Sequence, residues 1–286
     1  MAKTSKPPLP LLAKEGTLLS NYSQLRYIGV IQMEFNAVYV IVAREFKKFV
    51  RERSRLFSTI ARPLLWLFIV GAGMSRLVSP DAGVPYIQFI FPGILGMTIL
   101  FSSIFSSISI IWDKEFGFMK EILVAPVSRF SIVIGKALSG TVVSTIQAAI
   151  ILALFPFIGF KLGILQIIWV IIICASISFS ISAFGIVLAT FYDSYESFSV
   201  IMNFIIMPMF FLSGAMYPVK LLPDILRIVS MINPLTYGVD AIKHIIFTFE
   251  AGRMSPDFPF IIDIIVIILT SIIFVLIAGK SFERKG

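Results

Sequence analysis

Charged residues are scarce in this sequence. They make up 14% of its 286 positions, about half the share of an ordinary soluble domain. Hydrophobic residues reach 58%, and a soluble fold of this length could not hide so much apolar surface. A lipid bilayer accepts such a surface, because lipid is the solvent for the outside of each helix.

Metal-binding and redox residues are almost missing. The one cysteine, Cys174, lies in an apolar run, which excludes a disulfide within the chain and a cysteine-rich metal site. The one histidine, His244, has no second type of metal ligand clustered with it in the sequence. The sequence therefore predicts no metal site, and it shows no polar cluster of the kind that an intramembrane enzyme needs.

A nucleotide-binding loop is also missing. The only Gly-Lys-Ser lies at 279–281, and position 274, where a P-loop needs its first glycine, is a phenylalanine. The segment 1–55 contains no apolar run followed by a cleavage site, so no signal peptide is predicted. We expect no catalysis by this chain, so that any ATP hydrolysis would be carried out by a partner subunit.

Long apolar stretches, in contrast, are abundant. Six of them approach the roughly 20 residues that cross about 30 Å of hydrocarbon. They lie at about 60–78, 87–111, 132–157, 164–190, 198–217 and 259–279. Pro208 and the pair Ser213-Gly214 predict that the fifth is short or kinked. The predicted fold is an all-α integral membrane protein with six transmembrane helices.

The region before the first span has two predicted parts. Residues 1–32 are polar and contain prolines, which predicts a flexible tail. Residues 33–59 have helical periodicity with one apolar and one basic face, which is typical of a helix lying in the membrane interface. Arg53 breaks the apolar face, and it either extends its charge to the lipid surface or contacts a partner.

Lysine and arginine predict the orientation. With a cytoplasmic amino terminus, the inner segments hold 18 of the 24 basic residues. Both termini, including a tail at 280–286, are therefore predicted to be cytoplasmic. The basic excess then reflects topology and contact with anionic membrane lipids, and no nucleic-acid binding is expected.

Two segments outside the spans have helical patterns of their own. Residues 113–124 predict a short amphipathic helix that Asp113 caps and Pro126 ends, with Phe116 and Met119 on its apolar face. We expect this helix to pack on the chain's own interfacial helix. Either that is its only role, or it also contacts a cytoplasmic partner. Three charged side chains are candidates for that contact: Glu115, Lys120 and Glu121.

The second segment, 218–250, lies on the outer side. Asn233-Pro234 predicts a helix start, because asparagine caps and proline fits the first helical position. Asp240, Lys243 and His244 lie away from the apolar stripe of this helix. The segment is either a plain lid or a re-entrant helix that dips into the outer leaflet.

Polar residues within the spans are few, which argues against a carrier driven by protons or sodium. Gln147 and Asn203, in the third and fifth spans, either join helices by hydrogen bonds or contact substrate, and Met207 is a further pathway candidate. Arg62 and Asp263, near the ends of the first and sixth spans, are predicted to be interfacial anchors.

The non-spanning segments carry a resemblance. The motifs are Glu115-x-Gly117, Leu123-Val-Ala-Pro-Val-Ser-Arg129, Gly135-Lys136, Ser213-Gly214, Tyr217-Pro218, Leu222-Pro223 and Asn233-Pro-Leu-Thr-Tyr-Gly-Val-Asp-Ala-Ile-Lys243. With these motifs in this order, the chain from about residue 33 to its end resembles the permease subunit of a bacterial type-2 ATP-binding-cassette (ABC) exporter. That family includes drug-resistance, nodulation-factor and polysaccharide export permeases. One departure is Lys243, where an arginine is common.

The resemblance implies two permease copies around a central pathway lined by the second and fifth spans, in the cytoplasmic (inner) membrane of a bacterium. It also implies two copies of a cytoplasmic ABC ATPase, which would hold ATP and Mg, with no cofactor on this chain. Segment 113–124 would be the coupling helix. The implied ATPase-coupling residues are Asp113, Glu115, Phe116, Met119, Lys120, Glu121 and Arg53. The implied outer re-entrant motif consists of Ser213, Gly214, Asn233, Pro234, Tyr237 and Asp240.

The expected function is export of an amphiphilic or lipid-like substrate, such as a drug, lipid or glycan. ATP-driven alternating access of the paired permeases would move it. The alternative is a secondary carrier or channel that works without ATP, which would transport along a gradient as a purified chain alone.

Overall fold

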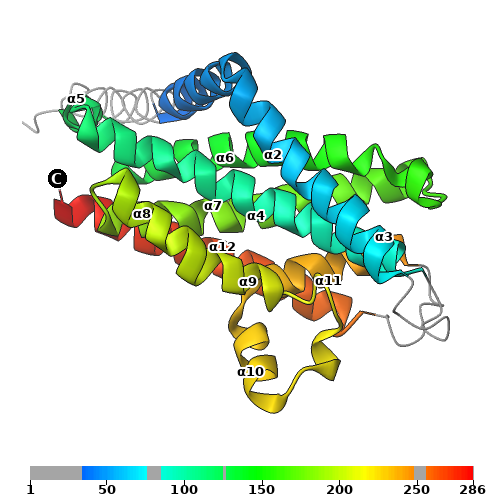
Figure 1. Cartoon of the computed structure of the whole chain (residues 1–286). Coiled ribbons are helices and arrows are strands. Elements are labelled where there is room, and N and C mark those ends of the chain that lie inside the picture. Colours follow the sequence, from blue (N-terminus) through cyan, green and yellow to red (C-terminus); the bar gives the residue numbers. More distant parts are fainter. Residues whose placement is uncertain (1–33, 76–84, 125–126, 248–255, 286) are drawn as a thin grey trace, which may run out of the picture.

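The computed structural model describes residues 34–75, 85–124, 127–247 and 256–285, and every regular element in these ranges is a helix (Figure 1). The predicted tail 1–32 lies outside them. Four helices are long and apolar enough to cross a membrane: α4 (Tyr86–Glu115), α6 (Arg129–Leu152), α7 (Ile164–Phe191) and α12 (Phe260–Lys285). Shorter apolar stretches lie at Ile60–Met74 and Tyr195–Phe211. The chain is therefore an all-helical, multi-pass membrane protein.

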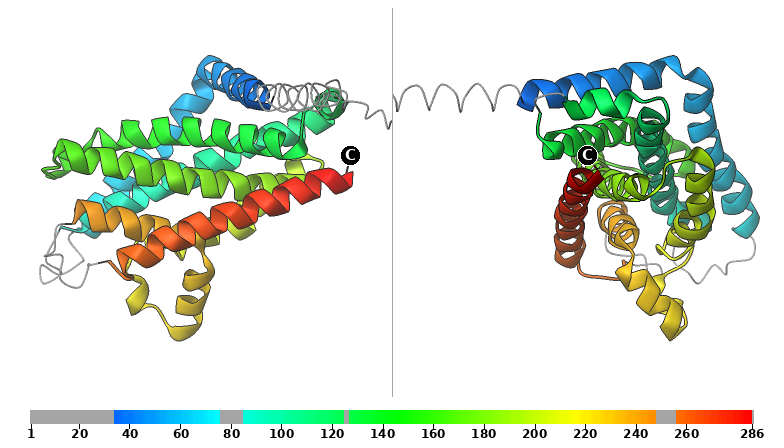
Figure 2. Two further views of the ribbon diagram at one scale, coloured as in Figure 1. Left: turned by 180° about the vertical axis from the view of Figure 1, so that it is seen from behind. Right: turned by 90° about the vertical axis from the view of Figure 1, so that its left-hand side faces the viewer.

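The long helix α4 lies at the centre of the bundle. Its side chains are buried almost continuously from Phe89 to Ile104, and α6, α7 and α11 (Pro234–Ile246) pack around it. In contrast, α12 packs along α7 and α11 (Figure 2). Most of its apolar residues are exposed. An exposed apolar face of this length suits contact with lipid.

Small residues let the central helices approach closely. Gly140 of α6 lies against Ser182 of α7, and Gly93 of α4 lies against the backbone of Ala215. Within the same core, Ser103 of α4 donates a hydrogen bond of 3.0 Å to Ser144 of α6. Packing and interhelical hydrogen bonds are what join helices in lipid, so these contacts hold the bundle together.

The predicted interfacial helix is divided in two. One helix covers residues 34–51, and the backbone leaves the helical conformation at Glu52. Then α2 (Arg53–Leu65) leads without a break into the π-helical turn η1 (Trp66–Val70) and α3 (Gly71–Met74). Ile41 packs against Gly135 of α6, so the 34–51 helix lies on the bundle at the start of α6.

The fifth apolar stretch is short and interrupted, as its proline predicts. It consists of α8 (Tyr195–Ile201), the π-helical turn η4 (Met202–Ile206) and α9 (Met207–Phe211), with Pro208 in the first turn of α9. It stops at Phe211 and not at residue 217, because Gly214 adopts a left-handed conformation with φ of 71°. Trp66 of η1 packs edge-on against Phe210, so the two short apolar stretches are neighbours.

After the fifth stretch the chain forms η5 (Val219–Leu221), α10 (Asp224–Ile232) and α11. Two views show α10 standing away from the bundle, while α11 lies within it (Figure 2). The predicted start of α11 is confirmed: Pro234 is its first residue, and the Asn233 side chain accepts a hydrogen bond from the Leu235 amide.

Three other helix ends differ from the expected ones. The third stretch ends at Leu152 rather than residue 157, and the 3-10 turn η3 (Phe155–Ile158) follows it. The last helix, α12, continues through 280–285, the segment expected to be a tail. The predicted helix 113–124 is broken, because α4 runs to Glu115 and a separate α5 (Phe118–Val124) begins after Gly117.

Each end of the bundle contains a buried lysine, Lys136 at one end and Lys243 at the other. The Lys136 end contains the end of α4, α5 and the start of α6. The Lys243 end contains the start of α4, α11 and the start of α12. Lys136 is 5% exposed and Lys243 is 1% exposed.

Candidate functional site

At the Lys136 end, an ionic network joins three segments of the chain. The Lys136 ammonium of α6 lies 2.6 Å from Asp113 Oδ2 of α4 and 2.8 Å from Glu45 Oε1 of the 34–51 helix. It also donates to the hydroxyl of Ser109 at 3.1 Å. The Arg44 guanidinium covers the open side of the network, 3.1 Å from Glu45 and 3.3 Å from Asp113. The interfacial helix, α4 and α6 are therefore held as one unit.

The positive charges in this network lower the pKa of Glu45. Burial alone raises the pKa of this carboxyl group, but the attraction of Lys136 and Arg44 outweighs burial, and its pKa lies below the usual value. Glu45 is therefore ionised at neutral pH. A buried ion pair of this kind stabilises the fold only while both partners are present, since either one alone is an uncompensated buried charge.

The hairpin between α4 and α5 departs from the predicted coupling helix. Gly117 has φ of 81°, a conformation that glycine adopts readily, and it turns the chain sharply between the two helices. Asp113 was expected to cap a helix, but it is a residue of the last turn of α4 and faces Lys136. The turn also separates Phe116, which is 70% exposed, from Met119, which is buried, so they do not share one face.

The remaining coupling candidates are placed as follows. Glu115 and Glu121 are exposed on either side of the hairpin. The side chains of Lys120 and Arg53 lie outside the described part of the structure, as does Pro126. The hairpin therefore presents Phe116 and two carboxylates on the outside of the Lys136 end.

Lys114, which the sequence analysis missed, anchors the base of this hairpin. Its ammonium donates to the carbonyl oxygens of Ala189, Thr190 and Tyr192 at 2.9, 3.2 and 3.1 Å, at the carboxyl end of α7. Cations stabilise that end of a helix, because the last carbonyl groups have no partner within it. A cavity of about 340 Å³ lies beside this contact, lined in part by Glu115, Met119 and Phe282. The hairpin is thus fixed to α7 as well as to α6.

At the Lys243 end, a second buried network organises the residues after the fifth stretch. Lys243 donates to the carbonyl oxygen of Gly214 at 2.9 Å and lies 3.7 Å from Asp257 and 3.9 Å from Asp240. Asp240 accepts hydrogen bonds from the backbone amides of Asp257 and Phe258. Asp240 and Lys243 were expected to lie away from the apolar stripe, yet both are buried, since this polar face of α11 packs against the rest of the chain.

The predicted outer motif is brought together by hydrogen bonds. The Asn233 amide donates to Met209 O at 2.7 Å, and the Tyr237 hydroxyl donates to Met231 O at 2.8 Å. Ser213 bonds to Phe210 O at 2.7 Å, next to the turn at Gly214. These bonds connect α9, α10 and α11, which explains why these residue types occur at this spacing.

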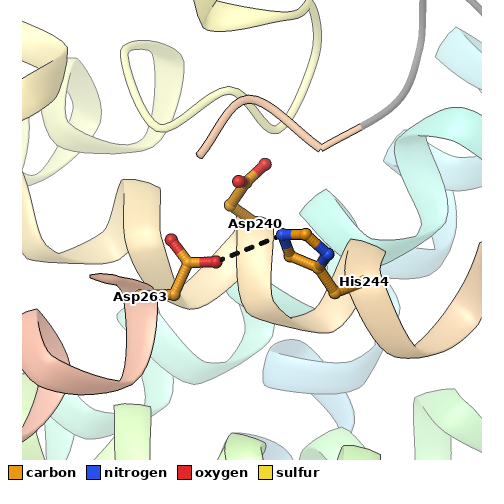
Figure 3. A group of neighbouring side chains, drawn as sticks. All are labelled: Asp240, His244 and Asp263. Atoms are coloured by element: carbon orange, nitrogen blue, oxygen red, sulfur yellow. Dashed lines mark ion pairs between the residues drawn. The ribbon is translucent and has the colours of Figure 1, made fainter. Parts of the chain in front are cut away.

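His244 lies among carboxylates, contrary to the expectation that no other ligand type would cluster with it. Donor atoms of Asp240, His244 and Asp263 lie within 4.8 Å of one another (Figure 3). Asp263, expected to be an interfacial anchor, is 0% exposed and points toward His244, because the first turn of α12 packs against α11. The sequence did not predict this cluster, because Asp240 and His244 are on α11 whereas Asp263 lies in the first turn of α12, the next helix.

The three predicted pathway residues are not gathered in one place. Gln147 of α6 is buried in the bundle at 1% exposure, whereas Asn203 of η4 is exposed and donates to Ser199 O at 3.3 Å in its own helix. Met207 is half-buried in α9. Gln147 and Asn203 therefore do not line one common surface of a single chain.

An apolar cavity of about 430 Å³, also missed from the sequence, lies beside the fifth stretch. Phe204 and Met209 of the fifth stretch, Phe184 of α7 and Phe274 of α12 contribute to its wall. The polar side chain of Asn233 is also part of the lining. A cavity of this size and composition fits an apolar group or an acyl chain.

Comparisons with known proteins agree with these features. The family model described as "ABC-2 type transporter" matches residues 36–247. The putative transport permease ycf38 of Cyanophora paradoxa is 32% identical over 279 residues, covering 93% of this chain and 94% of the relative. Nodulation protein J of Rhizobium meliloti (strain 1021) is 26% identical over 200 residues, covering 66% of this chain and 73% of the relative.

A probable multidrug ABC transporter permease, YbhR of Escherichia coli (strain K12), is 29% identical over 172 residues, covering 58% of this chain and 45% of the relative. The family match covers most of the 34–51 helix, the α4–α5 hairpin and all of α11, including Asp240 and Lys243. ABC permeases are non-catalytic membrane subunits that work with separate ATPase subunits. The chain belongs to the ABC-2 type transporter family, as a membrane permease subunit.

Proposed function

We propose that this permease exports an amphiphilic or lipid-like substrate across the cytoplasmic membrane of a bacterium. It works as a homodimer that binds two copies of a cytoplasmic ATPase. In this arrangement the chain crosses the membrane six times, with both termini and the Lys136 end at the cytoplasmic surface. ATP and Mg are bound by the ATPase, and alternating access at the dimer interface moves the substrate.

The six-span arrangement uses the two short apolar stretches as the first and fifth spans. Ile60–Met74 is about 22 Å long at 1.5 Å per residue, which is less than the usual hydrocarbon thickness. Each short stretch contains a π-helical turn, η1 or η4, and such turns frequently occur at functional sites. Both short stretches expose apolar side chains, such as Ile69 and Phe204. Such a surface favours contact with a second copy of the chain.

The observation that carries the proposal is the anchoring of the α4–α5 hairpin. Lys114 fastens its base to α7, and Asp113 fastens it through Lys136 to α6 and the interfacial helix. The outside of the hairpin meanwhile presents Phe116, Glu115 and Glu121. A push on this surface would be transmitted to three helices as a rigid movement, which is what coupling to an ATPase requires.

The substrate class rests on the apolar cavity beside the fifth span. Its wall of phenylalanine and methionine side chains suits an acyl chain or an apolar drug. One relative is named as a probable multidrug permease, and an apolar drug is among the molecules that this cavity suits. Drug, lipid and lipid-linked glycan all remain candidate substrates.

Co-purification with the ATPase tests the proposal. In nanodiscs, the permease should retain an ATP-binding subunit, and charge reversal by Glu121→Lys or Glu115→Lys should lower its permease-stimulated ATP hydrolysis severalfold. Glu196→Lys is the matched control, because it reverses an exposed carboxylate of α8 outside the hairpin. Transport by the purified permease alone, driven by a gradient, would instead support a secondary carrier or channel.

A further inference from the structure

Three donor groups at the Lys243 end lie at distances suited to one small cation. Asp240 and His244 occupy positions one turn apart on α11, and Asp263 lies in the first turn of α12 (Figure 3). His244 Nε2 is 3.6 Å from Asp263 Oδ2. In a tetrahedral site with bonds of about 2.0–2.1 Å, neighbouring donor atoms are about 3.3 Å apart. Small side-chain shifts therefore bring this pair into coordination distance.

Asp263 is the member of this group that needs a partner. Its side chain is fully buried, and neither carboxylate oxygen has a hydrogen-bond partner among the described residues. Leaving a buried carboxylate unpaired is strongly unfavourable, so native structures provide a partner for such a group. The carboxylate of Asp263 is directed toward His244 (Figure 3).

The buried lysine nearby does not supply that partner. Lys243 donates to Gly214 O and lies within 3.9 Å of Asp240 and Asp257. The buried ammonium group thus lies between two carboxylates, and Asp263 adds a third carboxylate to this part of the described structure without contacting it. The excess of negative charge favours a divalent cation.

We infer that Asp240, His244 and Asp263 form a divalent transition-metal site, with Zn²⁺ as the ion that fits best. One imidazole nitrogen and two carboxylate oxygens suit Zn²⁺, whereas Ca²⁺ and Mg²⁺ prefer oxygen ligands alone. Thiolate coordination is excluded for this chain, since its one cysteine, Cys174, lies within α7.

The surroundings of the three residues resemble the second shell of a metal site. The amides of Asp257 and Phe258 hold the Asp240 carboxylate, and each of its oxygens keeps a further lone pair. His244 Nε2 donates a hydrogen bond of 2.7 Å to Phe258 O, because a carbonyl oxygen only accepts. Coordination through Nε2 therefore requires this bond to open and the ring proton to move to Nδ1. Phe258 O is then available as a fourth ligand.

The ion would fasten α11 to α12 at the Lys243 end. Asp240 and His244 belong to the helix that is connected to Gly214 through Lys243, and Asp263 belongs to the last long helix. The site is thus a structural clamp, and it does not depend on the proposed substrate or direction of transport.

Metal analysis of the whole permease tests this inference directly. The protein is purified with a histidine-free tag, stripped with a chelator, and titrated with Zn²⁺ against a zinc-sensitive dye, with metal content measured by mass spectrometry. One Zn²⁺ per chain is expected. Asp263→Asn and His244→Gln should weaken binding by at least about tenfold. Asp224→Asn, at an exposed carboxylate in the first turn of α10, should bind as the unchanged protein does.

Two further measurements keep the test independent of variant folding. Co²⁺ bound to the unchanged protein should give a visible absorption band of a low-symmetry, nitrogen- and oxygen-ligated site, and Zn²⁺ should displace it. Ca²⁺ and Mg²⁺ should not compete with Zn²⁺. The inference is overturned if the unchanged protein binds no Zn²⁺, or if a folded Asp263→Asn protein binds it equally well.

Discussion

Asp113 of α4 and Lys136 of α6 form an ion pair of 2.6 Å, directly before the hairpin that leads into α5. The same ammonium group contacts Glu45 of the 34–51 helix. The end of α4 therefore cannot move relative to α6 or the 34–51 helix without separating buried charges. This relationship makes the Lys136 end a single mechanical unit.

Replacing the lysine of this network should destabilise the fold. In Lys136→Met, the carboxylates of Glu45 and Asp113 keep only the half-exposed Arg44 as a counter-charge, which should lower the free energy of unfolding by up to about 3–5 kcal/mol. Thermal unfolding in detergent measures the loss. Lys47→Met, at an exposed lysine of the same interfacial helix, should have little effect. Equal losses in the two variants would show that the network adds no stability.

The network should also make stability depend on acidity. The pKa of Glu45 is lowered in the folded chain, so its stabilising contribution is complete above the unfolded value of 4.5 and is lost as the pH falls through the folded value. The unfolding temperature should fall on acidification in this range. Glu45→Gln should reduce the slope, and an unchanged slope in this variant would exclude Glu45 as its source.

Close helix packing at Gly93 gives a third prediction. A side chain at this position of α4 would collide with the backbone of Ala215, so Gly93→Ala should cost about 1–3 kcal/mol through overpacking. Gly73→Ala is the matched control, because the described residues place no neighbouring atom within 4 Å of the added carbon there. The two unfolding temperatures should differ clearly, and matching values would mean that α4 and the turn at Ala215 are not so close.

The contact between Lys114 and α7 gives a fourth prediction. In Lys114→Met the last carbonyl groups of α7 lose a charged donor, which should lower stability by about 2 kcal/mol. ATP hydrolysis by the complex should also become less dependent on substrate, since the hairpin is no longer fixed to α7. Lys161→Met, at an exposed lysine, serves as the control for both measurements. Unaltered coupling in Lys114→Met would mean that this anchor does not transmit movement.

The elements that the sequence predicts well are those with local signals. Apolar stretches of sufficient length predict α4, α6, α7 and α12, although the turns at Leu152 and Glu115 shift their ends. Asn233-Pro234 predicts the start of α11, because capping is decided by neighbouring residues. The motifs between residues 115 and 243 predict the permease family, and the family model matches the same part of the chain.

The features that the sequence leaves open depend on contacts between distant residues. Asp113 has the sequence pattern of a helix cap, and only the position of Lys136, on another helix, makes it part of a buried network. His244 looks isolated along the chain, although folding brings Asp263 next to it. Gly117 was the one local signal for the break before α5, and its meaning depended on the conformation it adopts.

Contact between the α4–α5 hairpin and the ATPase is the central claim, and site-specific photo-crosslinking tests it most directly. A photoreactive phenylalanine analogue replaces Phe116 on the hairpin or, as the control, Phe157 in η3; both side chains are highly exposed, at 70% and 85%. The account predicts a crosslink to the ATP-binding subunit from position 116 and none from position 157. A crosslink from position 157 alone, or from neither position in an ATPase-active complex, would contradict it.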